Sequence, residues 1–218
     1  PEILLIKKRY TNAYADFIQG KYDSVENKKQ ILDLLNKMTV DEKMLILSMD
    51  FVQMWYKVWL KKDNDYVFIK ARNKFESTFA IDKGDRLKKM ILKSQSILMQ
   101  WEIPKGRKKC KNESNISCAT REFYEETKIA KRLYTIFPNA KKEISFIDNR
   151  VCYSQVYYFA VTTHNFEPVI NINDKGQISE INEIQWLNIE QIRSCDISNR
   201  LEYIVKPLFN YVKKKMRF

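Results

Sequence analysis

The sequence predicts a mixed α/β domain that is interrupted near its N-terminus by an all-helical insertion. Residues 3–6 form a short apolar run of the kind found in buried strands. From about residue 10 the apolar spacing becomes helical, and later in the chain strand-like runs alternate with further helical segments. We therefore expect an α/β domain built from residues 1–9 and 95–218, with a helical insertion domain at residues 10–94.

Helix signals recur along the insertion. Thr39 and Glu42 have the spacing of a capping box, which marks the first turn of a helix. Trp55 and Trp59, also at helical spacing, suit either the core of the insertion or a homodimer interface. Another helix is expected to begin at Asp85. Its apolar and basic residues fall on different faces, with Leu87, Met90, Ile91 and Leu98 on one and Arg86, Lys89 and Lys93 on another.

The remaining elements are expected to alternate between helix and strand. One helix runs from Ser114 or Asn115 to Lys128, a second covers residues 189–195, and a C-terminal helix is kinked or interrupted at Pro207. The strand-like runs are at residues 97–101, 134–137, 144–147, 151–163 and 181–186. No internal repeat accompanies them.

Composition narrows the function classes. Of the 218 residues, 39 are Lys or Arg and 27 are Asp or Glu, and the formal net charge of +12 favours a polyanionic partner such as nucleic acid. Four scattered cysteines and a single histidine, His164, argue against a zinc site and against hydrolases that use a histidine base. The apolar runs are too short to cross a bilayer, and the cysteine pattern suits a reducing compartment, so a cytoplasmic location is expected.

A cluster of acids is the most specific chemical signal. Glu122, Glu125 and Glu126 stand at i, i+3 and i+4 of an expected helix and therefore share one face. Three neighbouring carboxylates repel one another, so their presence in a basic chain calls for a cation. Because Mg²⁺ prefers hard oxygen ligands and also binds phosphates, the cluster predicts a divalent metal site for phosphate chemistry.

The residues around this cluster resemble the Nudix box, G-x5-E-x7-R-E-φ-x-E-E-x-G-φ, in which φ is apolar. The chain has Gly106, then Glu113, then R-E-F-Y-E-E at 121–126, and W-E-I-P-K at 101–105 precedes them. The loop between Gly106 and Glu113 is one residue longer than the pattern, and Lys128 replaces its last glycine. That glycine ends the helix in a left-handed conformation, which costs other residues about 1–2 kcal/mol.

The resemblance implies a Nudix fold, an α/β/α sandwich with a mixed sheet, and hydrolysis of a diphosphate linkage with Mg²⁺ or Mn²⁺ as cofactor. It implies that Arg121 orients the glutamates by ion pairing and that Glu126 is the base for the attacking water. A further catalytic acid is expected at Glu180, which matches the E-I-x-x-I-x-W pattern of the late Nudix strand better than Glu183 does. The implied metal ligands are Glu122, Glu125, Glu126, Glu180 and Gly106.

Over most of its length the chain further resembles the mRNA-decapping enzymes of large DNA viruses, which carry a helical insertion after the first Nudix strands. Residues 5–14, 36–56 and 101–107 carry this resemblance, and a giant virus is the expected source. The implied substrate is capped mRNA. Hydrolysis of its cap triphosphate bridge would release 7-methyl-GDP and leave RNA with a 5′-monophosphate.

Cap and RNA contacts are expected from that resemblance and from charge. Cap recognition needs aromatic rings around the cationic methylated guanine. The expected cap and substrate contacts are Tyr14, Tyr157, Lys105 and Lys8, although Tyr157 or its neighbour Tyr158 has to face the core if the segment is a strand. The expected RNA-binding residues are Arg86, Lys89, Lys93, Lys213, Lys214 and Lys215.

Two other interpretations stay open. The same box, metals and basic residues would serve a Nudix hydrolase of inositol pyrophosphates or diadenosine polyphosphates. An inactive Nudix-fold RNA-binding module is the second, with the longer loop and Lys128 as signs of decay. The intact glutamates argue against that second interpretation.

Overall fold

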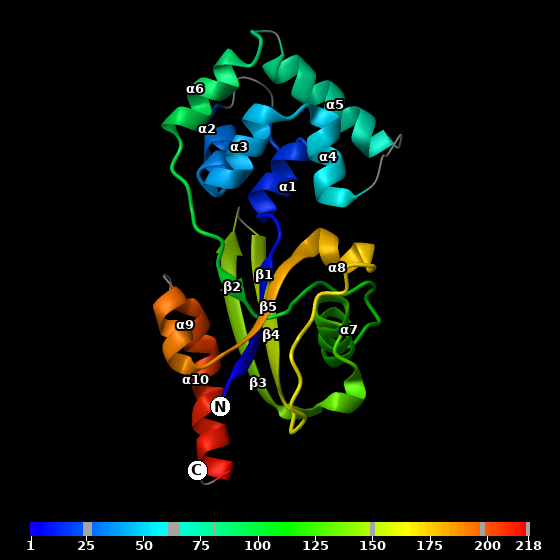
Figure 1. Cartoon of the computed structure of the whole chain (residues 1–218), viewed down its shortest axis with the longest axis vertical. Helices are drawn as coiled ribbons and strands as arrows, with labels where there is room; N and C mark the ends of the chain where they lie inside the picture. The colour runs from blue at the N-terminus through cyan, green and yellow to red at the C-terminus, as the bar shows by residue number, and fades with distance from the viewer. Residues whose placement is uncertain (24–27, 61–65, 81, 149–150, 197–198, 217–218) are drawn as a thin grey trace. The chain divides into compact units, whose positions relative to one another are not determined.

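The chain folds into two compact units, described here from a computed structural model (Figure 1). The structure describes residues 1–23, 28–60, 66–80, 82–148, 151–196 and 199–216, without the side chains of 148 and 213–216. The α/β unit consists of Pro1–Lys7 and Gln100–Phe218, and the helical unit consists of Lys8–Met99. The expected class, a mixed α/β fold with a helical region near the N-terminus, is confirmed.

The described part of the helical unit is built from short helices. They are α1 (Asn12–Ile18), α2 (Lys28–Leu35), α3 (Val40–Ser48), α4 (Phe51–Trp59), α5 (Tyr66–Phe79) and α6 (Asp85–Lys93). At the start of α3, the Glu42 N–H donates to Thr39 Oγ1 at 3.2 Å and the Thr39 N–H donates to Glu42 Oε2 at 2.8 Å. The expected capping box is therefore confirmed.

Aromatic side chains form the core of the helical unit. Tyr14 and Phe17 of α1 are fully buried, and the ring centroids of Phe17 and Phe79 lie 5.7 Å apart. Trp55 is only 4% exposed, and its ring centroid lies 4.1 Å from that of Trp59. Burying a large apolar side chain contributes roughly 1.5–3 kcal/mol. Trp55 thus belongs to the core, which was one of the two roles expected for it.

The α/β unit contains a three-stranded sheet of order β2-β1-β5 and the antiparallel pair β3-β4 among its described residues. The strands are β1 (Ile3–Lys8), β2 (Trp101–Glu102), β3 (Thr135–Asp148), β4 (Val151–Val161) and β5 (Ile181–Leu187). β1 pairs antiparallel with β2. Leu5 and Ile6 are completely buried, so the first apolar run is a buried strand, as predicted.

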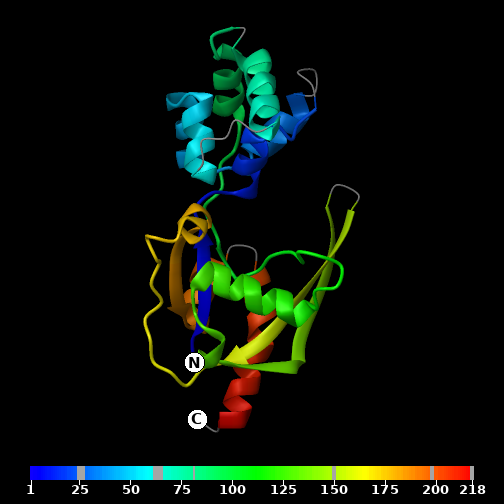
Figure 2. The same ribbon diagram turned by 90° about the vertical axis from the view of Figure 1, so that its right-hand side faces the viewer.

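Helices cover both sides of these strands. They are α7 (Asn115–Thr127), α8 (Lys175–Glu180), α9 (Ile189–Cys195) and α10 (Arg200–Met216). Helix α7 lies on one side of the strands, and α9 and α10 lie on the other (Figures 1 and 2). Leu5 of β1, Ile192 of α9 and Val205 of α10 share one buried cluster, which holds the second pair of helices against the sheet. Helix α10 continues through Pro207, so it is not interrupted there.

Two strand predictions need correction. The strand expected at residues 97–101 is reduced to β2, because the Ile97 N–H bonds to the Met38 carbonyl at 3.0 Å within the helical unit. Helix α6 ends at Lys93, so Leu98, which is 71% exposed, is not part of its apolar face. The runs expected at 134–137 and 144–147 form one strand, β3, whose pairing with β4 is irregular between Phe137 and Lys141.

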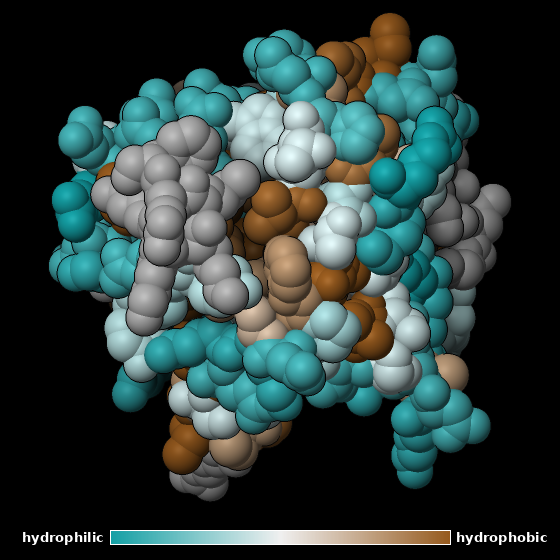
Figure 3. All heavy atoms as spheres, turned by 90° about the horizontal axis from the view of Figure 1, so that it is seen from below, coloured by the Kyte–Doolittle hydropathy of each residue, from teal (hydrophilic) through white to brown (hydrophobic). Residues whose placement is uncertain are grey.

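The surface carries apolar as well as charged side chains. Seen from below, apolar atoms gather in the middle of the face and hydrophilic side chains border them (Figure 3). Ile172 of the α/β unit is 79% exposed and Tyr66 of the helical unit is 77% exposed. Exposed apolar side chains are ordinary for folded proteins. In the described ranges, none of the helices has the length and apolar character that a membrane span requires.

Candidate active site

Helix α7 carries the acid cluster, and both of its ends are capped. The Ser117 N–H donates to Ser114 Oγ at 3.1 Å, which determines where the helix begins. At the other end Lys128 has φ +58° and ψ 14°, and its N–H bonds to the Tyr124 carbonyl at 2.8 Å. The expected helix limits are confirmed, and Lys128 takes the left-handed conformation that a glycine would adopt there.

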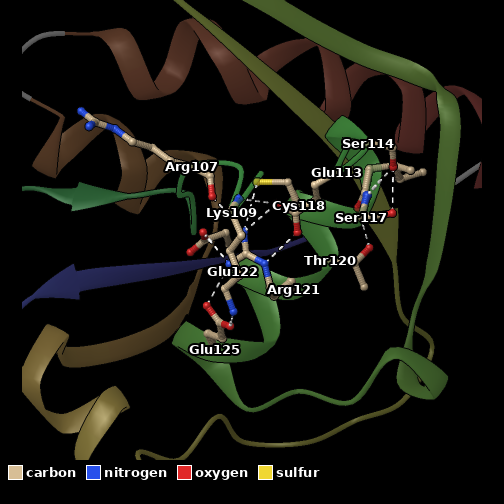
Figure 4. A network of polar contacts seen from close by, with 11 residues as sticks. Arg107, Lys109, Glu113, Ser114, Ser117, Cys118, Thr120, Arg121, Glu122 and Glu125 are labelled. Carbon is tan, nitrogen blue, oxygen red and sulfur yellow. Dashed lines mark hydrogen bonds and ion pairs between the residues drawn. The ribbon is translucent and has the colours of Figure 1, made fainter. Parts of the chain in front are cut away.

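Arg121 lies at the centre of the cluster (Figure 4). Its Nε donates to Glu113 Oε1 at 2.8 Å, and its Nη1 donates to Glu122 Oε1 at 2.7 Å and to Glu125 Oε2 at 2.9 Å. Its Nη2 donates to the Arg107 carbonyl at 2.8 Å, which links the preceding loop to the helix. These charge-assisted bonds offset the repulsion among the carboxylates. They lower the pKa of Glu113 to about 2, and the bond with Glu113 raises the pKa of Arg121.

The loop before α7 contributes a second cation, Lys109. Its Nζ lies 2.8 Å from Glu125 Oε1, and its backbone N–H donates to Glu113 Oε2 at 2.8 Å. The pKa of Glu125 is lowered, first by Lys109 and then by Arg121. Sequence reasoning did not single out Lys109, because neither its spacing nor its type marks a contact across the loop. The contact depends on how the longer loop folds back onto α7.

Glu126 differs from the other acids because it is buried, with 3% of its surface exposed. Its Oε2 accepts a hydrogen bond from the Lys105 N–H at 2.9 Å, and its backbone carbonyl accepts one from Gln177 Nε2 at 2.9 Å. Gln177, of α8, is itself 1% exposed. The carbonyl of Glu126 is one of the last in α7, where a helix has no internal donor, so Gln177 satisfies it.

Gly106 has a steric role in the cluster. A β-carbon at this position would lie 2.0 Å from Cδ and 2.1 Å from Oε2 of Glu122. Atoms at that distance overlap, so any other residue would push the Glu122 carboxylate aside. The glycine of the motif is therefore explained by the close approach of Glu122 to the loop backbone.

Lys128 also links α7 to α8. Its Nζ lies 2.6 Å from Asp174 Oδ2, and the other oxygen of Asp174 accepts the Gln177 N–H at 2.9 Å. The ion pair with Lys128 is the main cause of a lowered pKa for Asp174. Asp174 and Gln177 were not predicted. Asp174 is the N-cap of α8 and accepts the N–H of Gln177, and an aspartate just before a helix is a recognisable N-cap signal. Lys128 thus does more than replace a glycine.

Comparison with known proteins identifies this arrangement of loop, arginine and glutamates. The NUDIX domain model matches residues 79–206. The chain belongs to the Nudix family. The Nudix box is therefore the segment from Gly106 to Ile129, and its two departures are the longer loop and Lys128.

Relatives extend the similarity beyond the Nudix box. The chain is 37% identical over 224 aligned residues to "mRNA-decapping protein g5R" of African swine fever virus (isolate Pig/Kenya/KEN-50/1950), with 100% of this chain and 91% of the relative covered. The protein of the same name from isolate Warthog/Namibia/Wart80/1980 is 35% identical with the same coverage. A crystal structure of C. elegans Ap4A hydrolase overlaps 52% of this chain and 77% of its own, at 17% identity and a TM-score of 0.42.

Members of the Nudix family generally use divalent metal ions, and the donor atoms here fit such an ion. Glu122, Glu125 and Glu126 supply hard carboxylate oxygens from successive turns of α7. No three acidic, histidine or cysteine side chains are gathered into a ready-made metal cluster among the residues that the structure describes. In the structure Arg121 bonds Glu122 and Glu125, and Glu126 accepts the Lys105 N–H. The three carboxylates remain the predicted ligands.

The acids expected outside the Nudix box lie at the start of β5. Glu180 is exposed and is the last residue of α8, directly before the strand that was expected to begin at Ile181. Its role as a metal ligand stays a prediction. Glu183 lies within β5, and its Oε1 pairs with Lys7 Nζ at 3.1 Å. Glu183 is thus an exposed strand residue that already has a cationic partner.

The expected cap contacts have mixed outcomes. Tyr14 is fully buried in the helical core and packs on Tyr10, so its prediction as a stacking residue is wrong. Tyr157 is half-buried and packs against the apolar cluster that contains Leu5 of β1. Its hydroxyl donates to Gln155 Oε1 at 2.7 Å. The Lys105 ammonium pairs with Glu102 of β2, and Lys8 is the last residue of β1. Substrate contacts by Tyr157, Lys105 and Lys8 stay predictions.

The predicted RNA-binding residues of the insertion line a groove. Arg86, Lys89 and Lys93 of α6 border an open groove of about 850 Å³ together with Lys28 of α2. Asp82 is the acidic residue in its lining, and Leu32 and Met90 are the apolar residues there. Lys213, Lys214 and Lys215 belong to α10, but their side chains lie outside the described part of the chain.

Proposed function

We propose that this chain is an mRNA-decapping Nudix hydrolase. It would hydrolyse the triphosphate bridge of the cap, releasing 7-methyl-GDP and RNA with a 5′-monophosphate. The observation that carries the proposal is the similarity to the African swine fever virus decapping protein over the whole of this chain, together with an intact set of Nudix box glutamates. The cross-linked geometry around Arg121 supports a catalytic rather than a degenerate box.

We assign metal binding to Glu122, Glu125 and Glu126, with Glu180 and the Gly106 backbone as further ligands. The assigned ion is Mg²⁺ or Mn²⁺. Such an ion neutralises phosphate charge and lowers the pKa of water when it is bound. Arg121 keeps the carboxylates of Glu122 and Glu125 in place, and it also holds the loop through the Arg107 carbonyl. The chemistry of the donor set, four carboxylates and a backbone carbonyl, supports this assignment.

Glu126 is the residue to which we assign proton removal from the attacking water. It is the most buried acid of the cluster, and the Lys105 N–H fixes the direction of its carboxylate. A base held rigidly in a partly dry site needs little reorganisation when the proton moves. Gln177 acts behind it as a positioning residue, through the Glu126 carbonyl.

The RNA chain is assigned to basic surface, chiefly the α6 groove with Arg86, Lys89 and Lys93, and to Lys213, Lys214 and Lys215 at the C-terminal end. Several phosphate contacts of this kind give an affinity that falls steeply with salt. Cap contacts are assigned to Tyr157, Lys105 and Lys8. Because the proposed substrate is capped mRNA, we assign the activity to the cytoplasm of a host cell. If the source is a virus, the protein could also be carried in the virion.

A homodimer is also proposed, since α3 exposes apolar residues on one face. Val40, Met44 and Leu47, at i, i+4 and i+7, are 60%, 57% and 43% exposed. Sedimentation of the wild type and of a Met44→Glu variant tests this proposal. A wild type that stays monomeric at high protein concentration contradicts it.

Decapping is tested with RNA labelled in its cap, incubated with Mn²⁺. We expect the wild type to release 7-methyl-GDP and Glu126→Gln to lower kcat by roughly 100-fold or more. Glu190→Gln, the same change at an exposed position of α9, is the matched control and should keep full activity.

The same assay separates the other interpretations. Hydrolysis of inositol pyrophosphates or diadenosine polyphosphates without release of 7-methyl-GDP would assign the site to those substrates. Tight RNA binding with no hydrolysis of any of these compounds would make the chain an RNA-binding module. Either result contradicts the decapping proposal.

A further inference from the structure

Each carboxylate oxygen of Glu125 is paired with a cationic side chain. Lys109 Nζ lies 2.8 Å from Oε1, and Arg121 Nη1 lies 2.9 Å from Oε2. Glu125 is at the same time one of the residues assigned to the metal. A divalent cation that binds Glu125 through either oxygen therefore has to displace one of these two side chains, or to share the carboxylate with both at the cost of repulsion.

The two cations are not equally easy to displace. The Lys109 side chain is 64% exposed, and within the described ranges its ammonium group makes one ion pair. The Arg121 side chain is 19% exposed and also bonds Glu113, Glu122 and the Arg107 carbonyl. An exposed single ion pair is weak because water screens it, whereas removing Arg121 would leave several partners without a donor. Lys109 is therefore the group that leaves.

We propose that Lys109 is a substrate-binding residue that pairs with Glu125 until a divalent cation takes that carboxylate, and that its ammonium then binds the polyphosphate of the substrate. The proposal rests on the metal site of the proposed function. Lys109 stays beside the site when its side chain rotates, because its backbone N–H remains bonded to Glu113. A compact ammonium on a flexible stem suits phosphate oxygens.

This arrangement makes the cation and the substrate cooperate. Lys109 competes with the cation for Glu125, which weakens cation binding on its own. A polyphosphate that binds Lys109 removes the competitor and strengthens cation binding, and linkage requires the reverse effect to be equal. Lys109 lies in the loop between Gly106 and Glu113, which is one residue longer than the family pattern, so the coupling depends on the fold of that loop.

The first experiment measures Mn²⁺ affinity by titration without substrate, for the wild type, Lys109→Met and Lys111→Met. Methionine keeps much of the stem and removes the charge. Lys111 lies on the same loop, is exposed, and makes no ion pair with the residues that the structure describes, so it controls for the change in net charge. Lys109→Met should bind Mn²⁺ roughly two- to fivefold more tightly, as expected when one exposed ion pair no longer competes. An affinity no higher than that of Lys111→Met overturns the proposal.

The second experiment measures binding of inorganic tripolyphosphate at saturating Mn²⁺. Lys109→Met should bind it more weakly than Lys111→Met does, and tripolyphosphate should raise the Mn²⁺ affinity of the wild type more than that of Lys109→Met. Tighter Mn²⁺ binding with unchanged tripolyphosphate binding overturns the substrate role of Lys109. Neither experiment needs turnover, so a failure to hydrolyse capped RNA counts against the decapping function and leaves this result to stand or fall separately.

Discussion

The acid site on α7 and the basic groove beside α6 are both charged, but they are held in different ways. In the acid site Arg121 alone bonds three glutamates and a loop carbonyl. In the groove, the cations of α6 stand at i, i+3 and i+7 of one helix, and Lys28 is added from α2. A cross-linked set of charges defines positions of atoms, whereas a stripe of charges defines an electrostatic potential. The first suits chemistry at one bond, and the second suits a polyanion of variable sequence.

Removal of Arg121 should have the largest effect, because the charges of the acid site depend on this one residue. Arg121→Met leaves Glu113, Glu122 and Glu125 without their shared donor, so the free energy of unfolding should fall by about 2 kcal/mol. Arg72→Met is the control, because among the described residues Arg72 forms a single ion pair, the exposed i, i+4 pair with Glu76 at 2.8 Å. Its loss should cost under about 0.5 kcal/mol. Urea unfolding of the two variants measures the difference. Equal losses would mean that the acid site is an ordinary charged helix face.

Neutralising the groove should weaken RNA binding. With Arg86, Lys89 and Lys93 all changed to Gln, affinity for single-stranded RNA should fall by roughly tenfold, and the slope of log affinity against log salt should drop by about 2. Changing Lys57, Lys70 and Lys83 to Gln removes the same charge from the helical unit outside the groove lining. Equal RNA affinity of the two triple variants at low salt would contradict an RNA path through the groove.

Acidification should remove the stabilisation that the charged carboxylates give the acid site, whereas the cations of the groove keep their charge. Glu113 has its pKa lowered from 4.5 to about 2, mainly by Arg121, so it stabilises the folded state fully above pH 4.5. That contribution is lost as the pH falls from 4.5 towards 2, because the carboxylate then becomes protonated. The stability difference between the wild type and Arg121→Met should therefore shrink in this window when unfolding is followed by urea titration. A difference independent of pH would show that packing, not charge, is what Arg121 provides.

The smallest effect is expected at Lys128. Lys128→Gly relieves the backbone strain of a left-handed conformation, which is worth about 1 kcal/mol. The change also deletes the ion pair with Asp174, which contributes about 0–1 kcal/mol. Stability should therefore rise slightly or stay level. Lys83→Gly is the matched control, since Lys83 has φ +56°, is exposed and has no ion pair with another described residue. The thermal midpoints of the two variants compare strain relief with and without a lost pair. A larger gain for Lys128→Gly than for Lys83→Gly would show that the Asp174 pair contributes nothing.

Local signals in the sequence were sufficient for much of the fold. The capping box of Thr39 and Glu42, the limits of α7 and the buried strand at β1 depend on residues close in the chain, and each is confirmed. Tyr14 shows what neither local signals nor a resemblance along the chain could determine. It was expected to contact the cap by resemblance, yet its ring is fully buried in the core that α1 shares with α2 and α4. Helical spacing gives the period of a face but not what the face meets.

For this protein, the sequence by itself determined the family motif, the acids of α7 and the basic stripe of α6, because each is set by spacing along one segment. Only the tertiary structure decided which cation neutralises which acid. Lys109, Asp174 and Gln177 reach α7 from a loop and from α8. Such contacts depend on how the loop and α8 pack against α7, and a hydrogen bond or ion pair needs that packing correct to within a fraction of an ångström. The clustered glutamates thus predicted a site, and the fold determined how its charges are held.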